Sequence, residues 1–279
     1  MIDLRAVTLI CVDTVNPNLA IKAMHKCLSS ATFGSAVLVT KKNPEIAAIS
    51  PQIHVIETGE IRNIEDYSTF IIKSIEPLTN TSHALIVQWD GFIQSAEAWD
   101  PCFLDYDYIG ATWPQYRDRM RVGNGGFSLR SKKLLLALQD PAIKAHNPED
   151  ECITRKYRTY LESKHGISIA PEAVADRFSQ ERKELPFDSF GFHGLARLAR
   201  TLQRRELEEL VDELPPSVFK STEARGFIKN LLDLGQLDLA KRAFCKRTQY
   251  SHHATIKEKI GNIRLKARLT FKEKTKWDR

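Results

Sequence analysis

The first half of the chain alternates short apolar runs with amphipathic segments. Two amphipathic segments, residues 17–29 and 64–75, carry apolar side chains at helical spacing and predict helices. The apolar runs around them are rich in β-branched residues and predict strands over residues 6–12, 35–40, 53–58 and 83–89. Strands that alternate with helices are typical of a parallel sheet. We therefore expect an α/β domain whose functional loops follow the strand ends.

The pattern changes after residue 89. Aromatic and acidic side chains crowd residues 89–113, and a glycine-rich segment follows at residues 123–130. Ser131 predicts the N-cap of one helix, and Asn147 with Pro148 predicts the start of another. We expect the functional site in this middle third of the chain.

The last third has helical apolar spacing throughout, with a break at Pro215 and Pro216. Residues 231–244, around Gly235, predict a helical hairpin. We therefore predict two domains, an α/β domain over residues 1–194 and a helical extension over residues 195–279.

The composition, with 42% hydrophobic and 27% charged residues, is typical of a folded protein and argues against disorder. No apolar stretch approaches the roughly 20 residues that a membrane-spanning helix needs, and the N-terminal segment predicts a buried strand rather than a signal peptide. The five cysteines are widely spaced and form no CxxC pair, which is typical of reduced thiols. We expect a soluble cytoplasmic protein.

The formal charge of +6 is concentrated at the C-terminal end, where residues 241–279 hold 13 Lys or Arg and three acids. Two interpretations of this basic tail stay open: peripheral contact of an amphipathic helix with an anionic membrane at the inner face, or a solvated helix packed through Leu265 and Leu269. No nucleic-acid-binding fold is indicated. The stripe that favours the membrane comprises Ile256, Ile260, Ile263, Ala267 and Phe271, flanked by Lys257, Lys259, Arg264, Lys266 and Arg268.

Several common active-site motifs are missing. Neither GxGxxG nor GxxxxGK[ST] follows the first predicted strand, and HExxH and GxSxG do not occur. Dinucleotide-binding and P-loop interpretations therefore lose their main support.

Oxygen-bearing side chains lie at the C-terminal end of the predicted strand 83–89. In HALIVQWDGFI, Gln88 and Asp90 lie two residues apart, so an extended chain would project both to the same side. An oxygen ligand at a strand end can hold Mg²⁺ or Mn²⁺ against a diphosphate. The alternative is that Asp90 and Gly91 form a tight turn.

The glycine-rich segment VGNGGFSLRS contains Asn124, Gly125 and Gly126. Glycines here let the backbone approach a ligand closely, although a plain turn before a strand would use the same residues.

Two acids and one histidine complete the candidate set. Glu149 and Asp150 stand at a predicted helix start, where they either stabilise the helix end or supply a general base. His193, in the segment FGFHG, is either a hydrogen-bonded core residue or part of the site.

Taken in order, the segments HALIVQWDGFI, FLDYDYIGATW, VGNGGFSLRSKKLLLAL, PEDECI and GFHG resemble a bacterial glycosyltransferase family filed as a domain of unknown function, over about residues 6–194. The resemblance implies a GT-A-like, Rossmann-like central mixed sheet flanked by helices, with a C-terminal all-helical extension.

The resemblance also implies roles for the candidates. Asp90, with Gln88 where the usual Asp-x-Asp motif has its first acid, would hold a divalent cation (Mn²⁺ or Mg²⁺) and the donor diphosphate, and His193 would complete the metal shell. Asp150, before Glu149, would be the base. The remaining candidates for donor contacts are Asn124, Gly125, Gly126, Asp13, Thr14 and Thr40.

These roles predict a nucleotide-sugar-dependent glycosyltransferase. It would act with inversion on a hydroxyl of a glycan or lipid-linked acceptor, in surface polysaccharide or lipopolysaccharide synthesis. Two other classes stay open: a non-catalytic nucleotide-sugar- or glycan-binding protein on the same fold, and a nucleotidyltransferase, which would release pyrophosphate.

Overall fold

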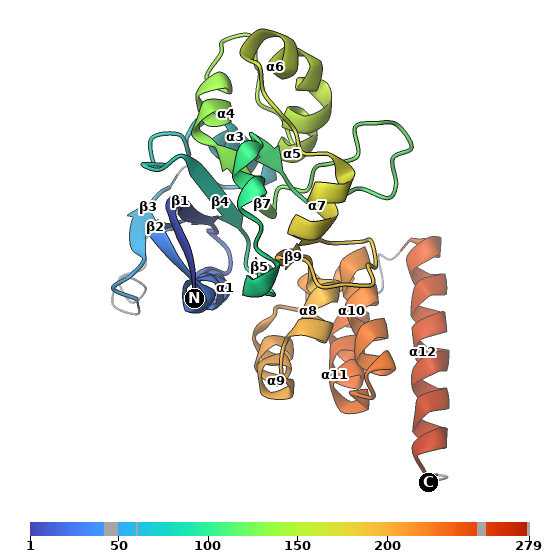
Figure 1. Cartoon of the computed structure of the whole chain (residues 1–279). Coiled ribbons are helices and arrows are strands. Elements are labelled where there is room, and N and C mark those ends of the chain that lie inside the picture. Colours follow the sequence, from blue (N-terminus) through green and yellow to red (C-terminus); the bar gives the residue numbers. More distant parts are fainter. Residues whose placement is uncertain (42–49, 60, 250–254, 278–279) are drawn as a thin grey trace. The chain divides into compact units, whose positions relative to one another are not determined.

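The computed structural model describes residues 1–41, 50–59, 61–249 and 255–277, and for Lys257 and residues 274–277 it describes the backbone alone. The rest of the basic tail, residues 250–254 and 278–279, lies outside the described residues. The chain divides into two compact units, Met1–His193 and Gly194–Arg279 (Figure 1). Each unit has its own buried apolar core.

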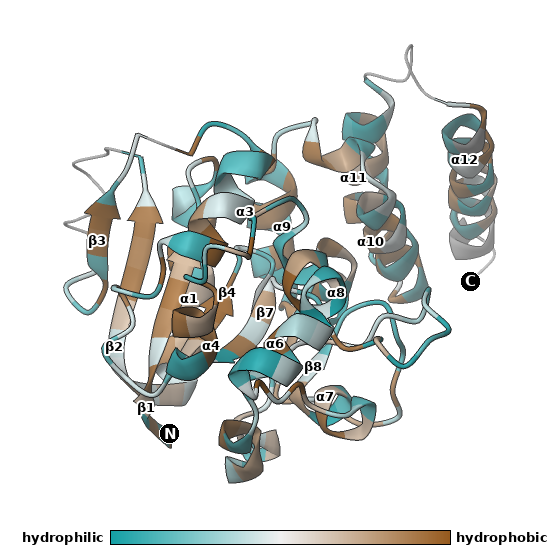
Figure 2. Ribbon diagram, turned by 90° about the horizontal axis from the view of Figure 1, so that it is seen from above, coloured by the Kyte–Doolittle hydropathy of each residue, from teal (hydrophilic) through white to brown (hydrophobic). Residues whose placement is uncertain are grey.

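A six-stranded sheet forms the centre of the first unit, in the order β3-β2-β1-β4-β7-β6 (Figure 1). The four strands that the apolar runs predict pair in parallel, whereas β7 and β6 join antiparallel. The strands are β1 (Ile2–Val12), β2 (Ala31–Thr40), β3 (His54–Glu57), β4 (His83–Val87), β6 (Tyr108–Ile109) and β7 (Phe127–Ser131). Figure 2 shows the long strands of this sheet as largely hydrophobic, as expected where both faces are covered.

Helices flank this sheet. On one face, Ile71 of α3 and Leu135 of α4 pack against strand residues such as Ile10 and Ile86. The helices are α1 (Pro17–Ser30), α3 (Ile64–Lys73), α4 (Lys132–Ala137), α5 (Glu149–Glu151), α6 (Arg158–His165) and α7 (Glu172–Phe178). Three irregular turns are η1 (Ala96–Ala98), η2 (Pro101–Asp105) and the π turn η3 (Cys152–Lys156). A central mixed sheet with flanking helices confirms the expected fold class.

Local sequence signals locate two of these helices correctly. Pro17 stands in the first turn of α1, and the Ser131 hydroxyl caps α4 by accepting the Leu134 N–H. The predicted start near Asn147 and Pro148 is also confirmed, but the Asn147 amide oxygen accepts from the Ser68 hydroxyl, so it caps no helix. The helix predicted beyond it is interrupted by the π turn η3.

A small second sheet brings distant segments together. It consists of β5 (Gly91–Ile93), β9 (Gly191–His193) and β8 (Ser179–Gln180), with β9 in the middle. Gly91 lies opposite His193 in the antiparallel β5–β9 pair. Phe92 and Phe192 meet edge to face across this pair, with ring centroids 4.7 Å apart. Aromatic packing therefore fixes the register that carries His193 to the end of β4.

The second unit is helical, as predicted. Its elements are α8 (Leu195–Thr201), α9 (Arg204–Glu213), η4 (Val218–Lys220), α10 (Thr222–Asp233), α11 (Leu237–Thr248) and α12 (Ile256–Trp277). The predicted hairpin is confirmed: α10 and α11 join at Gly235, whose φ of 74° lies in the left-handed region that favours glycine.

The last helix, α12, packs on α10 and α11. Leu265 and Leu269 are buried, and Arg268 pairs with Asp233 of α10, so one face of the tail helix is packed as the second interpretation expects. None of the helices in the described part of the chain has the length and apolar character needed to cross a membrane.

Candidate functional site

A pocket of about 260 Å³ in the first unit is lined by many of the residues singled out in the sequence. It combines polar groups with a few aromatic side chains, as small-molecule sites do. The lining includes Gln88, Asn124, Gly125, Gly126, Glu149, Asp150 and His193.

His193 is the centre of one side of this pocket. Its Nε2 lies 3.0 Å from Gln88 Oε1 and 3.3 Å from Asp90 Oδ1, and its Nδ1 lies 3.1 Å from the Asn124 amide nitrogen. Burial alone would lower the pKa of His193, but the negative charges of Asp90 and Glu181 outweigh it and raise this pKa to about 9. Asp90 lies in the turn between β4 and β5, as the alternative interpretation has it, and still reaches the same histidine as Gln88.

These groups fit a divalent cation only in part. Adjacent ligands of an octahedral Mg²⁺ lie about 3 Å apart, and Gln88 Oε1 and Asp90 Oδ1 each lie about this far from His193 Nε2. Asp90 Oδ1 is also buried and, apart from its ion pair with His193, has no hydrogen-bond partner among the described residues. Among the described residues, however, no group of three His, Cys, Asp or Glu side chains could hold a metal ion. A cation here would therefore depend on substrate oxygens for most of its ligands.

The glycines allow the backbone to approach both the histidine and an acid. A Cβ on Gly126 would lie 2.2 Å from His193 Nε2, and one on Gly125 would lie 1.8 Å from Glu149 Oε1. Asn124, between Gly123 and Gly125, has a φ of 56°. The glycine segment is therefore the turn before β7, and its backbone also lies between His193 and Glu149.

Glu149 is buried on the other side of this segment and pairs with an arginine that sequence patterns did not indicate. Arg130 of β7 is fully buried, and its Nη2 donates to Glu149 Oε1 at 2.9 Å. Burial raises the pKa of Glu149 to about 7, against the opposing effect of Arg130. Because arginine keeps its charge, Glu149 is the counter-ion that makes this buried strand position tolerable.

Asp150 has a different environment from its neighbour. Its Oδ2 accepts the Gly125 N–H at 3.1 Å and its Oδ1 accepts the Glu151 N–H at 2.8 Å. Burial raises the pKa of this carboxyl above its usual range. The bond to Gly125 ties the carboxylate to the glycine segment, so helix-end stabilisation alone does not describe it.

Three weaker candidates lie elsewhere. Asp13 accepts the Val15 and Asn16 N–H groups at the start of α1, and the Thr14 hydroxyl faces the Ile61 carbonyl at 3.4 Å. Thr40 is buried at the end of β2. None of the three is among the described residues that line the pocket.

The structure adds pocket residues that sequence patterns did not indicate. Tyr67 of α3 accepts a hydrogen bond from Gln88 Nε2 at 2.7 Å and so orients the amide oxygen toward His193. Trp113 packs against Gly123 and lines the pocket with Gln115. Sequence patterns did not indicate Tyr67 as a site residue, because its helical spacing is that of an ordinary amphipathic helix.

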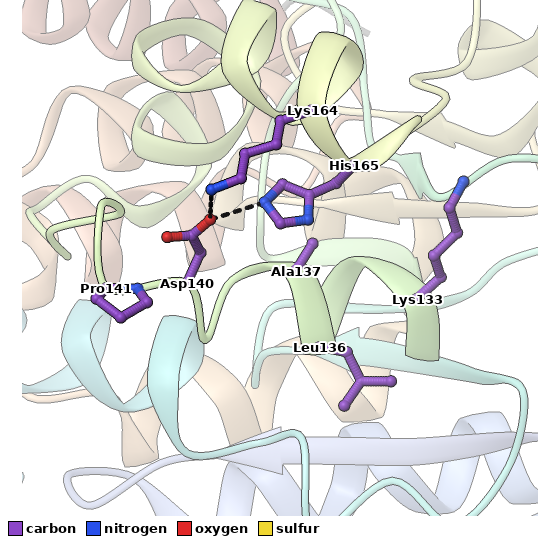
Figure 3. A pocket seen from close by; sticks show the side chains of 7 residues that line it. All are labelled: Lys133, Leu136, Ala137, Asp140, Pro141, Lys164 and His165. Carbon is purple, nitrogen blue, oxygen red and sulfur yellow. Dashed lines mark hydrogen bonds and ion pairs between the residues drawn. The ribbon is translucent and has the colours of Figure 1, made fainter.

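A second hollow of about 690 Å³ lies between α4 and α6 and is larger, but it contains none of the predicted site residues (Figure 3). Lys164 and His165 both point to Asp140, at 2.8 and 3.0 Å (Figure 3). Lys133 pairs with Asp107 at 3.2 Å. Since its charges are engaged in ion pairs, we treat this hollow as a structural junction.

Comparison with known proteins relates the chain to one family and several solved structures. No curated protein matches its sequence. A mannosyltransferase from Pyrobaculum calidifontis, in complex with GDP-Man and Mn²⁺, is 12% identical with a TM-score of 0.42, over 98% of this chain and 83% of the other. A galactosyltransferase in complex with donor and acceptor sugar analogs is 12% identical with a TM-score of 0.42, over 67% and 86%.

A glycosyltransferase involved in the glycosylation of the major capsid of PBCV-1 is 12% identical with a TM-score of 0.40, over 75% of this chain and 99% of the other. At these TM-scores the likenesses carry no argument about activity. The sequence family, in contrast, is shown directly, because its model matches residues 50–193, which include β4, the glycine segment, the acidic pair and His193. The chain therefore belongs to the family described as "Protein of unknown function (DUF5672)".

Proposed function

We propose that the protein is a glycosyltransferase that moves a sugar from a nucleotide-sugar donor to an acceptor hydroxyl. The observation that carries the proposal is the convergence of Asp90, Gln88 and His193 with Asp150 at one glycine segment. The first three groups suit a cation and a diphosphate, and the fourth suits a hydroxyl proton. We place catalysis in residues 1–194 and treat residues 195–279 as an extension.

The donor end of the site would be formed by Asp90, His193 and the Gln88 amide oxygen. Asn124, Gly125 and Gly126 offer backbone and a side-chain amide to the sugar and diphosphate. A bound Mn²⁺ or Mg²⁺ would supply positive charge against the departing nucleoside diphosphate.

Asp150 is the proposed base. The acceptor oxygen attacks the anomeric carbon while the bond from that carbon to the diphosphate oxygen breaks, and Asp150 takes the hydroxyl proton. Attack from the face opposite the leaving group inverts the anomeric centre. The raised pKa of Asp150 makes it a stronger base than an exposed aspartate, whereas Glu149, paired with Arg130, positions the glycine segment.

The resemblance of the sequence motifs supports a glycan or lipid-linked acceptor and surface polysaccharide or lipopolysaccharide synthesis. The widely spaced cysteines, without a CxxC pair, support a cytoplasmic location. These finer points are part of the proposal.

Donor binding tests the proposal. A panel of nucleotide sugars with Mn²⁺ is screened by thermal shift, where a ligand at 100 times its Kd stabilises the native state by about 2.7 kcal/mol. We expect one nucleotide class to bind, Asp90→Asn to weaken that binding in calorimetry, and Asp105→Asn, an exposed acid outside the pocket, to leave it unchanged. Unchanged affinity in Asp90→Asn would remove Asp90 from the site.

The products released distinguish a glycosyltransferase from a non-catalytic binding protein and from a nucleotidyltransferase. Release of nucleoside diphosphate in the presence of acceptor supports a transferase, and binding without release supports the non-catalytic alternative. Release of pyrophosphate from a nucleoside triphosphate would establish nucleotidyl transfer instead.

A further inference from the structure

The last helix of the second unit has two apolar faces, and the described residues of the chain cover one of them. Leu265 and Leu269 are 7% and 6% exposed and pack inward. Ile256 and Ile263, in contrast, are 78% and 67% exposed, and Ile260 is 46% exposed. Three solvated isoleucines on one helix are unusual because each leaves a large apolar surface in water.

The exposed apolar residues form a continuous stripe. At about 100° per residue, Ile256, Ile260, Ile263 and Ala267 fall within an arc of about 60°. Leu265 lies about 180° from Ile256 on the same helix. Packing on α10 and α11 therefore fixes the rotation of α12 and turns the isoleucine stripe to solvent.

Cations border this stripe on both sides. Lys259 and Lys266 lie on one flank and Arg264 on the other, and all three are exposed. Glu258 lies on the packed side of α12 and accepts from Thr255, whereas Glu273 follows Ala267 on the flank of Lys266 and pairs with Lys241 of α11. Between Ile256 and Ala267, the described part of the outer face is therefore apolar in the middle, with Lys259, Lys266 and Arg264 at its edges.

We propose that the outer face of α12 binds an anionic lipid surface, with the helix lying parallel to the membrane plane. The isoleucines would enter the boundary between headgroups and acyl chains, and the cations would reach lipid phosphates through their long apolar stems. The stripe from Ile256 to Ala267 is about 18 Å long, which suits a helix that lies in the interface.

The charges favour lipid over a second copy of the chain. Two copies that met through this stripe would bring Lys259, Lys266 and Arg264 of both helices to the same rim. Like charges at such a rim oppose association, whereas anionic headgroups complement them.

Co-sedimentation of the full chain with vesicles tests the proposal. We expect binding to vesicles that contain phosphatidylglycerol, and much weaker binding to phosphatidylcholine alone. Replacing Lys259 and Lys266 with Gln should lower the partition coefficient by about fivefold per cation, and added salt should weaken the binding of the unmodified protein.

The apolar stripe is tested separately. Ile256→Gln with Ile263→Gln should reduce partitioning by about tenfold or more, with an unchanged melting temperature, since both side chains are already solvated. The matched control is Leu234→Gln, an apolar residue of the same unit that is 47% exposed, which should bind like the unmodified chain.

Equal binding to neutral and anionic vesicles would overturn the proposal, as would undiminished binding of the double isoleucine variant. A dimer in sedimentation velocity that the isoleucine substitutions dissociate would assign the stripe to self-association instead. No residue of the proposed active site takes part, so the outcome does not depend on whether the protein transfers a sugar.

Discussion

Glu149 and Asp150 are neighbours in sequence, but their carboxyl groups have different partners. Glu149 faces the buried Arg130, and Asp150 reaches the backbone of Gly125 at the pocket. Chemically similar substitutions at the two positions should therefore have different consequences, one for catalysis and one for stability.

Asp150→Asn should leave the protein folded and reduce turnover. The amide oxygen can still accept one backbone N–H, so we expect a loss of about 1 kcal/mol or less in the free energy of unfolding. An amide takes no proton, so the rate should fall by about 10² to 10⁴. The measurement is nucleoside diphosphate release at saturating donor and acceptor, with Glu97→Gln as the exposed control. A near-normal rate would exclude Asp150 as the base.

Glu149→Gln should destabilise the fold. It leaves the Arg130 guanidinium buried without a counter-ion, which typically costs about 3–5 kcal/mol. Denaturant unfolding measures the loss. Adding Arg130→Met to this variant removes the unpaired buried charge and should recover part of the free energy of unfolding. Additive effects of the two substitutions would mean that the pair is not coupled in the native state.

At the scale of elements, the glycine segment before β7 depends on the absence of side chains. Gly126→Ala should push His193 away from Gln88 and Asp90, because the new Cβ would lie 2.2 Å from Nε2. We expect donor affinity to fall by about tenfold or more, because the displaced His193 side chain would no longer contact the donor diphosphate. Gly59→Ala is the control, since a Cβ there meets nothing within 4 Å. Calorimetry with unchanged affinity in Gly126→Ala would show that His193 does not contact the donor.

The junction between α4 and α6 should be sensitive to acid. Hydrogen bonds from Lys164, the Ala142 N–H and Tyr160 hold the pKa of Asp140 well below its usual range. A carboxyl with a depressed native pKa stabilises the fold above its unfolded pKa of about 4, and this stability is lost as the pH falls below that value.

The melting temperature of Asp140→Asn should therefore lie below that of the unmodified protein at pH 7. The difference should shrink as the pH is lowered toward 2. A difference that does not change with pH would mean that the Asp140 charge contributes nothing to the junction.

Elements with a local signal could be predicted from the sequence, and those fixed by distant contacts could not. The proline of α1 and the Ser131 cap of α4 act within a few residues, so their helices were located correctly. The β5–β9 pair depends on aromatic contacts between segments far apart in the chain. Arg130 was missed because its counter-ion Glu149 comes from a different element. Thus the sequence indicated seven of the seventeen residues that line the pocket, but not which acid pairs with the arginine.

At the scale of the whole molecule, the five cysteines are all free and differ in how deeply they are buried. Cys11 of β1 and Cys27 of α1 are fully buried, and Cys152 is buried beside the acidic pair. Cys102 is half-buried in η2, whereas Cys245 of α11 is exposed. Thiol reactivity therefore reports how far each part of the fold opens to solvent.

Under native conditions we expect alkylation to be fastest at Cys245 and slower at Cys102, whose pKa is raised by burial and by Asp100. Burial raises the pKa of Cys27 to about 12 and that of Cys11 well above its usual value, so neither forms the reactive thiolate at pH 8. Both thiols lie in the core and should react only when the first unit unfolds, at a rate set by its unfolding equilibrium. Pulsed alkylation with iodoacetamide, read by peptide mass spectrometry across a denaturant series, measures this order. If Cys27 were modified as quickly as Cys245 without denaturant, α1 would have to open independently of the sheet, contrary to the packing described above.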